Sequence, residues 1–209
     1  MLVDLSVIKF LDKVASNDPI PGGGSIAALN GAIASSLAAM VAGLTIGKKG
    51  YEEQSGLMES IQSVAVHHKE TFVVDVDRDS EAYDKVFACF KMPKDTPEEK
   101  SARSQAIQEA TKFAAEVPMS VARRAYALMD SIVEVARKGN SNAVTDACVA
   151  MMSARSAVLG ALMNVRINLG SLKDIEYVKK MQGEADELEK KACTKEKNLL
   201  DEISQKLRV

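Results

Sequence analysis

The stretch PIPGGGSIAALNGAIASSLAAMVAGLTIG, from Pro19 to Gly47, contains no charged residue and no histidine. Its three adjacent glycines, Gly22 to Gly24, favour a place where the backbone approaches another group too closely for a side chain. The residues that follow are mostly small, which predicts a helix from about residue 24 or 25 to residue 46 with close neighbours on several sides. The start of such a helix also offers free N–H groups to an anion.

This charge-free stretch is long enough to cross a bilayer. Its central Asn30 and its many small residues favour a buried central helix instead, so we expect no membrane partner. Residues 1–16 carry Asp4, Lys9, Asp12 and Lys13 in amphipathic spacing. That spacing predicts a short first helix over residues 4–16 rather than a signal peptide.

The composition indicates a helical protein. Of the 209 residues, 46% are hydrophobic but only 4% are aromatic, and Ala, Met, Leu and Val suit packed helices better than a sheet. The net charge of −2 provides no basic field, so nucleic acid is not an expected partner. Cys89, Cys148 and Cys193 lack metal-ligand spacing, and we expect them to be reduced, buried thiols of a cytoplasmic protein.

Start and stop signals divide the rest of the chain into four further helices, over about residues 52–90, 96–138, 142–169 and 171–209. Thr96, Pro97 and Glu99 form a capping box with proline at the first helical position, and Pro118 predicts a kink. No strand pattern is present. We therefore expect one all-α domain over residues 1–209, an antiparallel bundle of about six helices around the central Ala/Gly-rich helix.

The helix expected over residues 142–169 carries a stripe of polar side chains. At 100° per residue, five of them lie within about 40° of one line: Asn142, Asp146, Ser153, Asn164 and Asn168. Two interpretations stay open. These groups hydrogen-bond the heteroatoms of a ligand, or they cross-link buried helices, because buried polar groups must be paired.

The helix expected over residues 52–90 has a second polar line, formed by His68, Asp75, Asp79 and Tyr83. Two carboxylates one turn apart repel each other, so the pKa of one of them can rise. A carboxyl group with a raised pKa can act as a general acid, and the alternative is a solvated acidic face. Neighbouring histidines diverge by about 100° on a helix and no ligand spacing accompanies them, so we expect no metal.

Six motifs resemble, in order, those of the cyclodeaminase/cyclohydrolase family: residues 19–52, DVDRDSEAY (75–83), MPKDTPEEK (92–100), EVP (116–118), GNSNAVTDA (139–147) and GALMNVRINL (160–169). The resemblance covers nearly the whole chain. No formiminotransferase domain accompanies these motifs, so we expect a copy that stands alone. The resemblance implies a helical bundle that forms a homodimer, a tetrahydrofolate derivative as substrate and a place in histidine degradation.

The resemblance also implies roles for individual residues. Asp79 matches the proposed proton donor of the family, the Asp two residues before the Glu of EAY. The remaining expected residues fall into two groups: Pro21, Gly22, Gly23, Gly24, Asn140, Asn142, Asp146, Asn164 and Asn168 to bind the substrate, and His68, Asp75 and Tyr83 to support Asp79. Lys48, Lys49 and Lys94 are candidates for the glutamate tail. No cofactor is expected, because folate is the substrate.

Three functions are compatible with the sequence. The first is a formimidoyltetrahydrofolate cyclodeaminase, a lyase that releases ammonia as 5-formiminotetrahydrofolate closes to 5,10-methenyltetrahydrofolate. The second is a methenyltetrahydrofolate cyclohydrolase, which adds water to that product. The third is a helical dimer that binds folate or serves as a scaffold without chemistry. A buried Asp/Asn stripe argues against a pure scaffold, because a scaffold does not need one.

Overall fold

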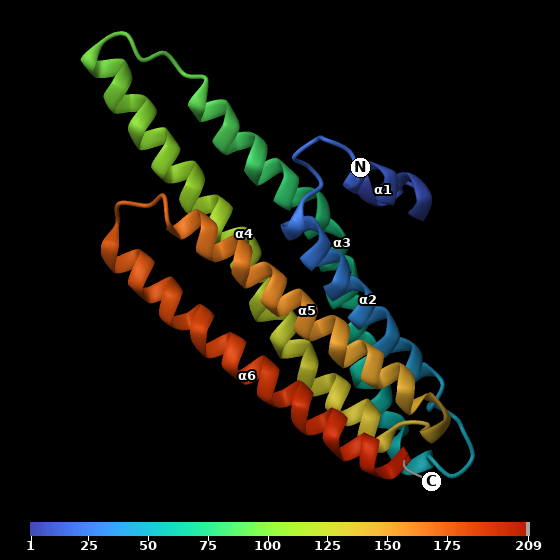
Figure 1. Cartoon of the computed structure of the whole chain (residues 1–209). Helices are drawn as coiled ribbons and strands as arrows, with labels where there is room; N and C mark the ends of the chain where they lie inside the picture. The colour runs from blue at the N-terminus through green and yellow to red at the C-terminus, as the bar shows by residue number, and fades with distance from the viewer. Residues whose placement is uncertain (208–209) are drawn as a thin grey trace.

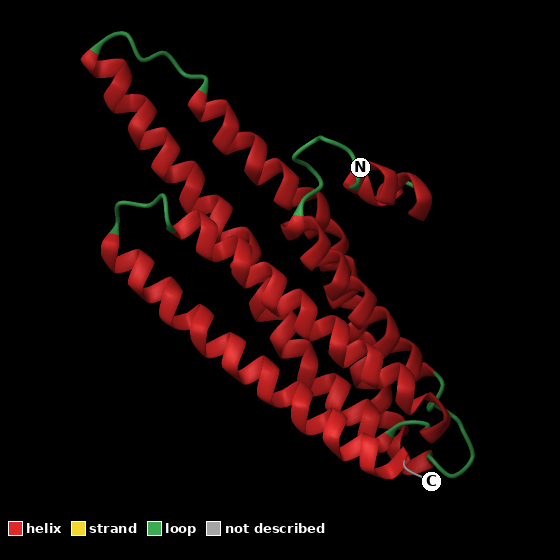
Figure 2. Cartoon of the chain, viewed as in Figure 1, coloured by secondary structure: helices red, strands yellow, loops and turns green. Residues whose placement is uncertain are grey.

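The computed structural model describes residues 1–207 (Figures 1 and 2). Within these residues the structure contains helices and no strand, which confirms the all-α expectation. The six α-helices are α1 (Val7–Val14), α2 (Gly23–Gly43), α3 (Ser55–Phe90), α4 (Pro97–Lys138), α5 (Val144–Leu169) and α6 (Ile175–Leu207). Short 3-10 helices cover Leu2–Asp4, Glu52–Gln54 and Ser141–Ala143.

Helices α2 to α5 form an antiparallel four-helix bundle. Helix α2 packs on α3 and α5, and α4 packs on the same two helices, so the four close into a ring. Helix α6 lies along α5 and α4, while the C-terminal part of α3 and the N-terminal part of α4 extend as a hairpin beyond the start of α2 (Figure 1). The start of α2 therefore meets α3 partway along its length.

The helix ends follow local chemistry. The Thr96 hydroxyl accepts from the Glu99 N–H at 3.2 Å and the Glu99 carboxylate accepts from the Thr96 N–H at 3.1 Å, as the capping box predicts. Helix α4 continues through Pro118. Helix α2 ends at Gly43, three residues earlier than expected, and the chain then turns at Gly47, whose φ of +68° favours glycine.

Small residues let α2 sit at the centre of the bundle. Ala28, Ala34 and Ala38 are fully buried, and Gly31 lies against the ring of the buried Phe72 on α3. On α5, Gly160 approaches Ala27 so closely that a Cβ there would lie 3.3 Å from the alanine Cβ. The expected central Ala/Gly-rich helix is therefore α2, which packs closely on both of its neighbours in the ring.

Helices α2 and α5 also present an uncovered apolar face. Its exposed members recur at helical spacing and are Ile33 and Met40 on α2, Leu44 directly after α2, and Val149, Met152, Met163 and Ile167 on α5. Both helical stretches, Gly23–Gly43 and Ser141–Leu169, are long and apolar enough to span a membrane by length and composition alone. About half of the first window (50%) and less of the second (44%) is buried inside this chain.

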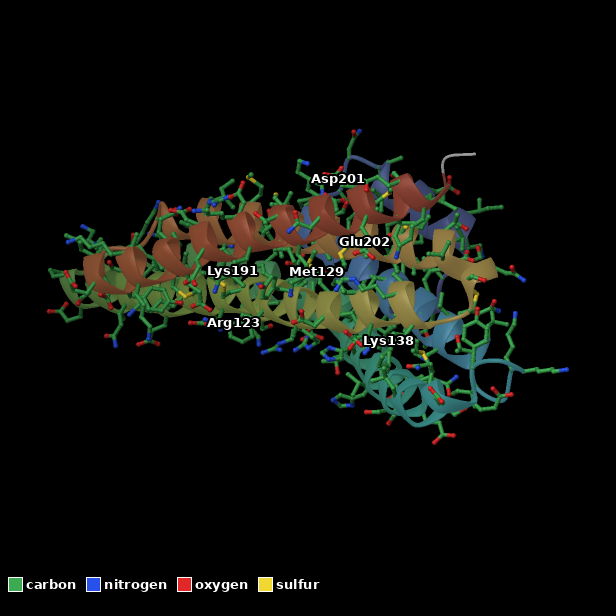
Figure 3. The ribbon with its side chains drawn as sticks, turned by 90° about the horizontal axis from the view of Figure 1, so that it is seen from below. Arg123, Met129, Lys138, Lys191, Asp201 and Glu202 are labelled. Carbon is green, nitrogen blue, oxygen red and sulfur yellow. The ribbon has the colours of Figure 1, made fainter. Side chains whose placement is uncertain are left out.

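The opposite side of the bundle is charged. Figure 3 shows α6 lying along α4, and ion pairs join the two helices, among them Arg123 with Glu184 at 2.6 Å and Arg137 with Glu202 at 2.8 Å. Exposed pairs of this kind each contribute about 0–1 kcal/mol, so apolar packing supplies most of the stability. The three cysteines are free but only half-buried, less buried than expected.

The close contact between Gly31 and Phe72 predicts a stability change. A Cβ at position 31 would lie 2.7 Å from the Phe72 ring, so Gly31→Ala should lower the free energy of unfolding by about 1–3 kcal/mol. Gly183→Ala on α6 is the matched control, because a Cβ there meets nothing within 4 Å and should stabilise the helix by up to about 1 kcal/mol. Urea unfolding followed by circular dichroism measures both. Equal effects of the two substitutions would contradict this packing.

Candidate functional site

The carboxyl group of Asp79 lies directly against the start of α2. A Cβ on Gly24 would fall 2.0 Å from Asp79 Oδ1 and 2.4 Å from its Cγ. Any side chain at position 24 would therefore displace the carboxyl group, which explains why glycine is needed there. Gly22 is the N-cap of α2, so Asp79 faces free N–H groups at the positive end of the helix dipole.

Ser25 connects Asp79 to the backbone of α3. Its hydroxyl oxygen lies 2.9 Å from the Val76 carbonyl oxygen, 3.2 Å from Asp79 Oδ2 and 3.3 Å from the Ser80 hydroxyl oxygen. A serine hydroxyl has one proton to donate and two lone pairs to accept with. When that hydroxyl donates to the nearer Val76 carbonyl, the Ser25 oxygen is free to accept a hydrogen bond from a protonated Asp79.

Burial raises the pKa of Asp79 above its ordinary value. Hydrogen bonds from the hydroxyl and the backbone N–H of Ser25 act in the opposite direction, and the negative charge of Asp75 adds a smaller upward contribution. The sequence predicted a raised pKa but attributed it to repulsion between the two aspartates. Loss of hydration is instead the main cause.

Asp75 is buried, with 1% of its surface exposed, and it is paired with two arginines. The guanidinium of Arg124 on α4 donates a short hydrogen bond to Asp75 Oδ2, and Arg78 Nη1 lies 3.6 Å from Asp75 Oδ1. The carboxylate of Asp75 is thus paired with positive charges, whereas the partners of Asp79 are the uncharged hydroxyl and N–H of Ser25. Of the expected supporting residues, Asp75 is the one that the structure places both buried and one turn from Asp79.

The other two supporting residues lie differently. His68 is eleven residues before Asp79, about 16 Å along α3, and its pKa is lowered mainly by burial and also by the charge of Arg124. Tyr83 is one turn after Asp79 but half-exposed, with its ring stacked on that of Phe87 at 6.3 Å between centroids. Tyr83 is near enough to contact a ligand at Asp79, whereas His68 is too distant.

Two predicted binding residues of α5 come to the same end of α2. A Cβ on Gly23 would lie 3.3 Å from Asn164 Nδ2, and Asn164 donates to the Gly160 carbonyl at 2.9 Å. Asn168 donates to the carbonyl oxygens of Asn164 and Ala114, both at 2.9 Å. These bonds use both side-chain N–H groups of Asn168 and one of the two on Asn164, so the side-chain carbonyl oxygens and the second Asn164 N–H are left for a ligand.

The remaining binding residues lie at the opposite end of the bundle. Asn140 accepts from Lys48 Nζ at 2.7 Å and from the Asn142 N–H at 3.1 Å, next to the C-terminal end of α2. Asp146 is in the first turn of α5, which runs antiparallel to α2. Helix α2 has 21 residues, so about 30 Å separates the two clusters. A single chain therefore divides the predicted substrate-binding set in two.

These positions divide the two interpretations of the α5 stripe. Of the stripe residues, Asn168 donates to the Ala114 carbonyl oxygen on α4, as cross-linking predicts. Pro21 is buried just before the glycines.

Within residues 1–207 no group of three His, Cys, Asp or Glu side chains is close enough to hold a metal ion. A large surface hollow lies between α4 and α6, lined by Tyr126, Lys190 and Lys195, away from Asp79.

Sequence reasoning missed Ser25 and Arg124. Ser25 directly follows the three glycines, so its place at the helix start was a usable signal for a polar group beside Asp79. Arg124 had no such signal, because Arg123 and Arg124 are adjacent and the sequence does not tell which of them faces α3. The structure turns Arg123 toward Glu184 on α6 and Arg124 toward Asp75.

Comparison with known proteins agrees with this architecture. The family model described as formiminotransferase-cyclodeaminase matches residues 6–187. A methenyltetrahydrofolate cyclohydrolase of Methylorubrum extorquens is 36% identical, and the match covers 95% of each chain. A formimidoyltransferase-cyclodeaminase of Rattus norvegicus is 31% identical over 92% of this chain, which spans only 36% of that protein.

A solved structure shares the fold over its full length. The crystal structure of a formiminotetrahydrofolate cyclodeaminase from Thermotoga maritima superimposes with a TM-score of 0.88, at 30% identity, and the match covers 100% of both chains. Both the sequence motifs and the helical bundle thus point to one group of folate-processing enzymes. The chain belongs to the formiminotransferase-cyclodeaminase family.

Proposed function

We propose that this protein is a formimidoyltetrahydrofolate cyclodeaminase, which closes 5-formiminotetrahydrofolate to 5,10-methenyltetrahydrofolate and releases ammonia. The observation that carries the proposal is the half-buried Asp79 at the start of α2, whose pKa is raised by burial. Membership of the family indicates that the substrate is a tetrahydrofolate derivative. The arrangement around Asp79 favours the deaminase among the family's reactions.

The reaction needs one proton at the departing nitrogen. Atom N10 of the substrate attacks the formimino carbon on N5, which gives a carbon bonded to three nitrogens. The formimino nitrogen enters protonated, so this attack converts it into an amino group. Protonated Asp79 donates to that amino group, which leaves as ammonia, and the carboxylate accepts the proton that N10 gives up. The site then has to hold N10 against the carbon, because a fixed orientation removes much of the barrier. The backbone N–H groups of Gly23 and Gly24, in the first turn of α2, are the donors available to the pterin beside the acid.

The need for a base separates the two candidate reactions. In the deaminase the nucleophile belongs to the substrate, and the reaction starts from protonated Asp79, the form that burial favours. Adding water to the methenyl carbon calls for a group that takes a proton from water. Asp75 is engaged by Arg124 and Arg78, and His68 is about 16 Å away along α3. The groups described around Asp79 thus fit ammonia release better than hydrolysis.

Methenyltetrahydrofolate cyclohydrolase is the second candidate. It is favoured by the relative of that name, which matches this chain over 95% of both lengths at 36% identity. Both reactions use the same folate skeleton and the same carbon. Release of ammonia together with the methenyl product separates the deaminase from the hydrolase.

A homodimer formed through the α2–α5 apolar face belongs to this proposal. Exposed apolar patches of this kind mark interfaces, and Met163 and Ile167 are 57% and 74% exposed in the single chain. A two-fold axis perpendicular to α2 in the plane of that face would bring the Asp79 end of one protomer to the Asp146 end of its partner. Each site would then unite the two halves of the predicted binding set.

In the shared site, Asp146 would recognise the pterin. A carboxylate can accept hydrogen bonds from both the ring N–H and the amino group of a 2-amino-4-oxopterin. Asp146 is half-buried in the first turn of α5. The enzyme needs no cofactor in this scheme, and its three free cysteines suit a reducing cytoplasm.

The proposed acid predicts the behaviour of Asp79→Asn. Supplied with 5-formiminotetrahydrofolate, the wild-type protein should form methenyltetrahydrofolate and ammonia in equal amounts, followed by absorbance and an ammonia assay. The variant should be about 10²–10⁴-fold slower, because it cannot donate the proton. Its thermal midpoint should be unchanged or higher, since an amide removes the cost of burying a charge. Faster loss of added methenyltetrahydrofolate, with no ammonia formed from 5-formiminotetrahydrofolate, would identify the cyclohydrolase.

The raised pKa of Asp79 predicts the pH dependence of the deaminase. A general acid acts in its protonated form, so kcat/KM should fall as pH rises through the pKa of Asp79. Because burial raises that pKa, the decline should begin above the ordinary aspartate value of 3.8. A pH series of initial rates, corrected for uncatalysed cyclisation, measures it. Activity that increases through the same range would indicate a base and contradict this role.

A shared site predicts complementation between two inactive variants. Asp79→Asn and Asp146→Asn should each be inactive alone, because every site then lacks one group. Co-expressed in equal amounts, they should recover up to about a quarter of wild-type activity, since half of the dimers are mixed and each has one intact site. Asp201→Asn, on the charged outer side of α6, is the control for co-expression: it should be fully active alone and about half as active as wild type when mixed with Asp79→Asn, because it retains both site groups. No recovery from a mixture that forms mixed dimers would contradict the shared site.

A further inference from the structure

The ion pair between Arg124 and Asp75 lies beside Asp79, and neither residue takes part in the proposed proton transfers. Asp75 is one helical turn before Asp79 on α3, and Arg124 reaches it from α4. The side chain of Arg124 is 21% exposed, and its guanidinium also lies over the ring of the buried Phe72, 5.3 Å from the centroid. The arginine is thus fixed by an aromatic ring, a carboxylate and the packing of two helices.

A buried carboxylate without a partner would be costly in this position. Taking a charge out of water costs several kcal/mol, and a like charge one turn away adds repulsion. Without Arg124, the Asp75 carboxylate would act on Asp79 as an uncompensated negative charge one helical turn away. With Arg124 in place, a guanidinium in direct contact compensates the charge of the Asp75 carboxylate, which leaves Asp79 as the group that exchanges a proton.

We propose that Arg124 is a positioning residue, which binds the carboxylate of Asp75 and so makes Asp79 the single proton-donating group of the site. The inference rests on the proposed function only in stating that this proton goes to the departing nitrogen of the substrate. Its electrostatic part is a property of the folded protein without substrate.

Charged and polar groups from four helices surround the two aspartates. Helix α2 contributes the hydroxyl and N–H of Ser25, which hydrogen-bond Asp79. Helix α3 contributes Asp75, Arg78 and the Ser80 hydroxyl, and helix α4 contributes Arg124. Helix α5 contributes no charged group to this contact, only the amide of Asn164 next to Gly23. His68 lies near Arg124, and burial together with that positive charge lowers its pKa.

Substitutions on the two sides of the pair should move the titration of Asp79 in opposite directions. Asp75→Asn removes a negative charge and leaves Arg124 unpaired, so the pKa of Asp79 should fall by about 0.5 pH unit or more. Arg124→Gln leaves Asp75 unpaired, so the pKa should rise by a similar amount. The double variant has neither charge and should lie between the two single variants.

The measurement is a carbon-13 NMR titration of aspartate carboxyl groups in the full-length protein without ligand, with the Asp79 signal assigned from Asp79→Asn. The pH profile of kcat/KM is measured in parallel. Arg123→Gln is the matched control, because the neighbouring arginine pairs with Glu184 on α6 (Figure 3) and should leave the Asp79 midpoint unchanged. If Arg124→Gln does not fold, Asp75→Asn and the double variant still decide the outcome.

A purely structural role would lower the thermal midpoint of these variants without opposite displacements of the Asp79 titration. An Asp79 midpoint that stays in place in Asp75→Asn, or that moves in the same direction in both single variants, would overturn the proposal. Opposite displacements in a protein that turns over neither folate would support the electrostatic role of Arg124 and reject the proposed function. Turnover of 5-formiminotetrahydrofolate together with an Asp79 midpoint that stays in place in both single variants would support the proposed function and reject the electrostatic role of Arg124.

Discussion

The close approach of the Asp79 carboxyl group to the backbone of Gly24 is the contact on which the rest of the site depends. It brings an acidic side chain from the middle of α3 to the first turn of α2, where no Cβ fits between them. The same approach lets Ser25 bridge Asp79 and the Val76 carbonyl. It also sets which turns of α2 lie against which turns of α3. Farther along the two helices, small residues of α2 keep them close, as Gly31 does against Phe72.

Two opposing effects act on the carboxyl group in this position. The helix start and the Ser25 donors favour the ionised form, whereas loss of hydration favours the neutral one. Burial is the larger effect, so the pKa of Asp79 is raised although the group faces the positive end of a helix. A neighbouring aspartate is tolerated because Arg124 binds it. Together these contacts provide an acid without a free base beside it, which is the basis of the proposed ammonia release.

Much of the fold was predictable from the sequence because its signals are local. The Thr96–Glu99 capping box fixed the start of α4, and the absence of charge in residues 19–47 indicated the central helix. The polar line on α3 indicated Asp79. What the sequence did not reveal depends on tertiary packing: which of two adjacent arginines turns inward, and that Asn164 lies against the start of α2. Helical periodicity places residues around an axis but says nothing of what lies against each turn.

The central claim is that folate binds with its reacting nitrogens at Asp79, and a crystal structure with tetrahydrofolate measures this most directly. Tetrahydrofolate lacks the carbon that is transferred, so it binds without reacting. We expect the pterin beside Gly23 and Gly24, with N5 or N10 within about 3.5 Å of the Asp79 carboxyl group directly or through one water. We also expect Asp146 of a second protomer at the pterin edge. Tetrahydrofolate bound elsewhere, for example in the hollow between α4 and α6, with Asp79 untouched, would contradict the central claim.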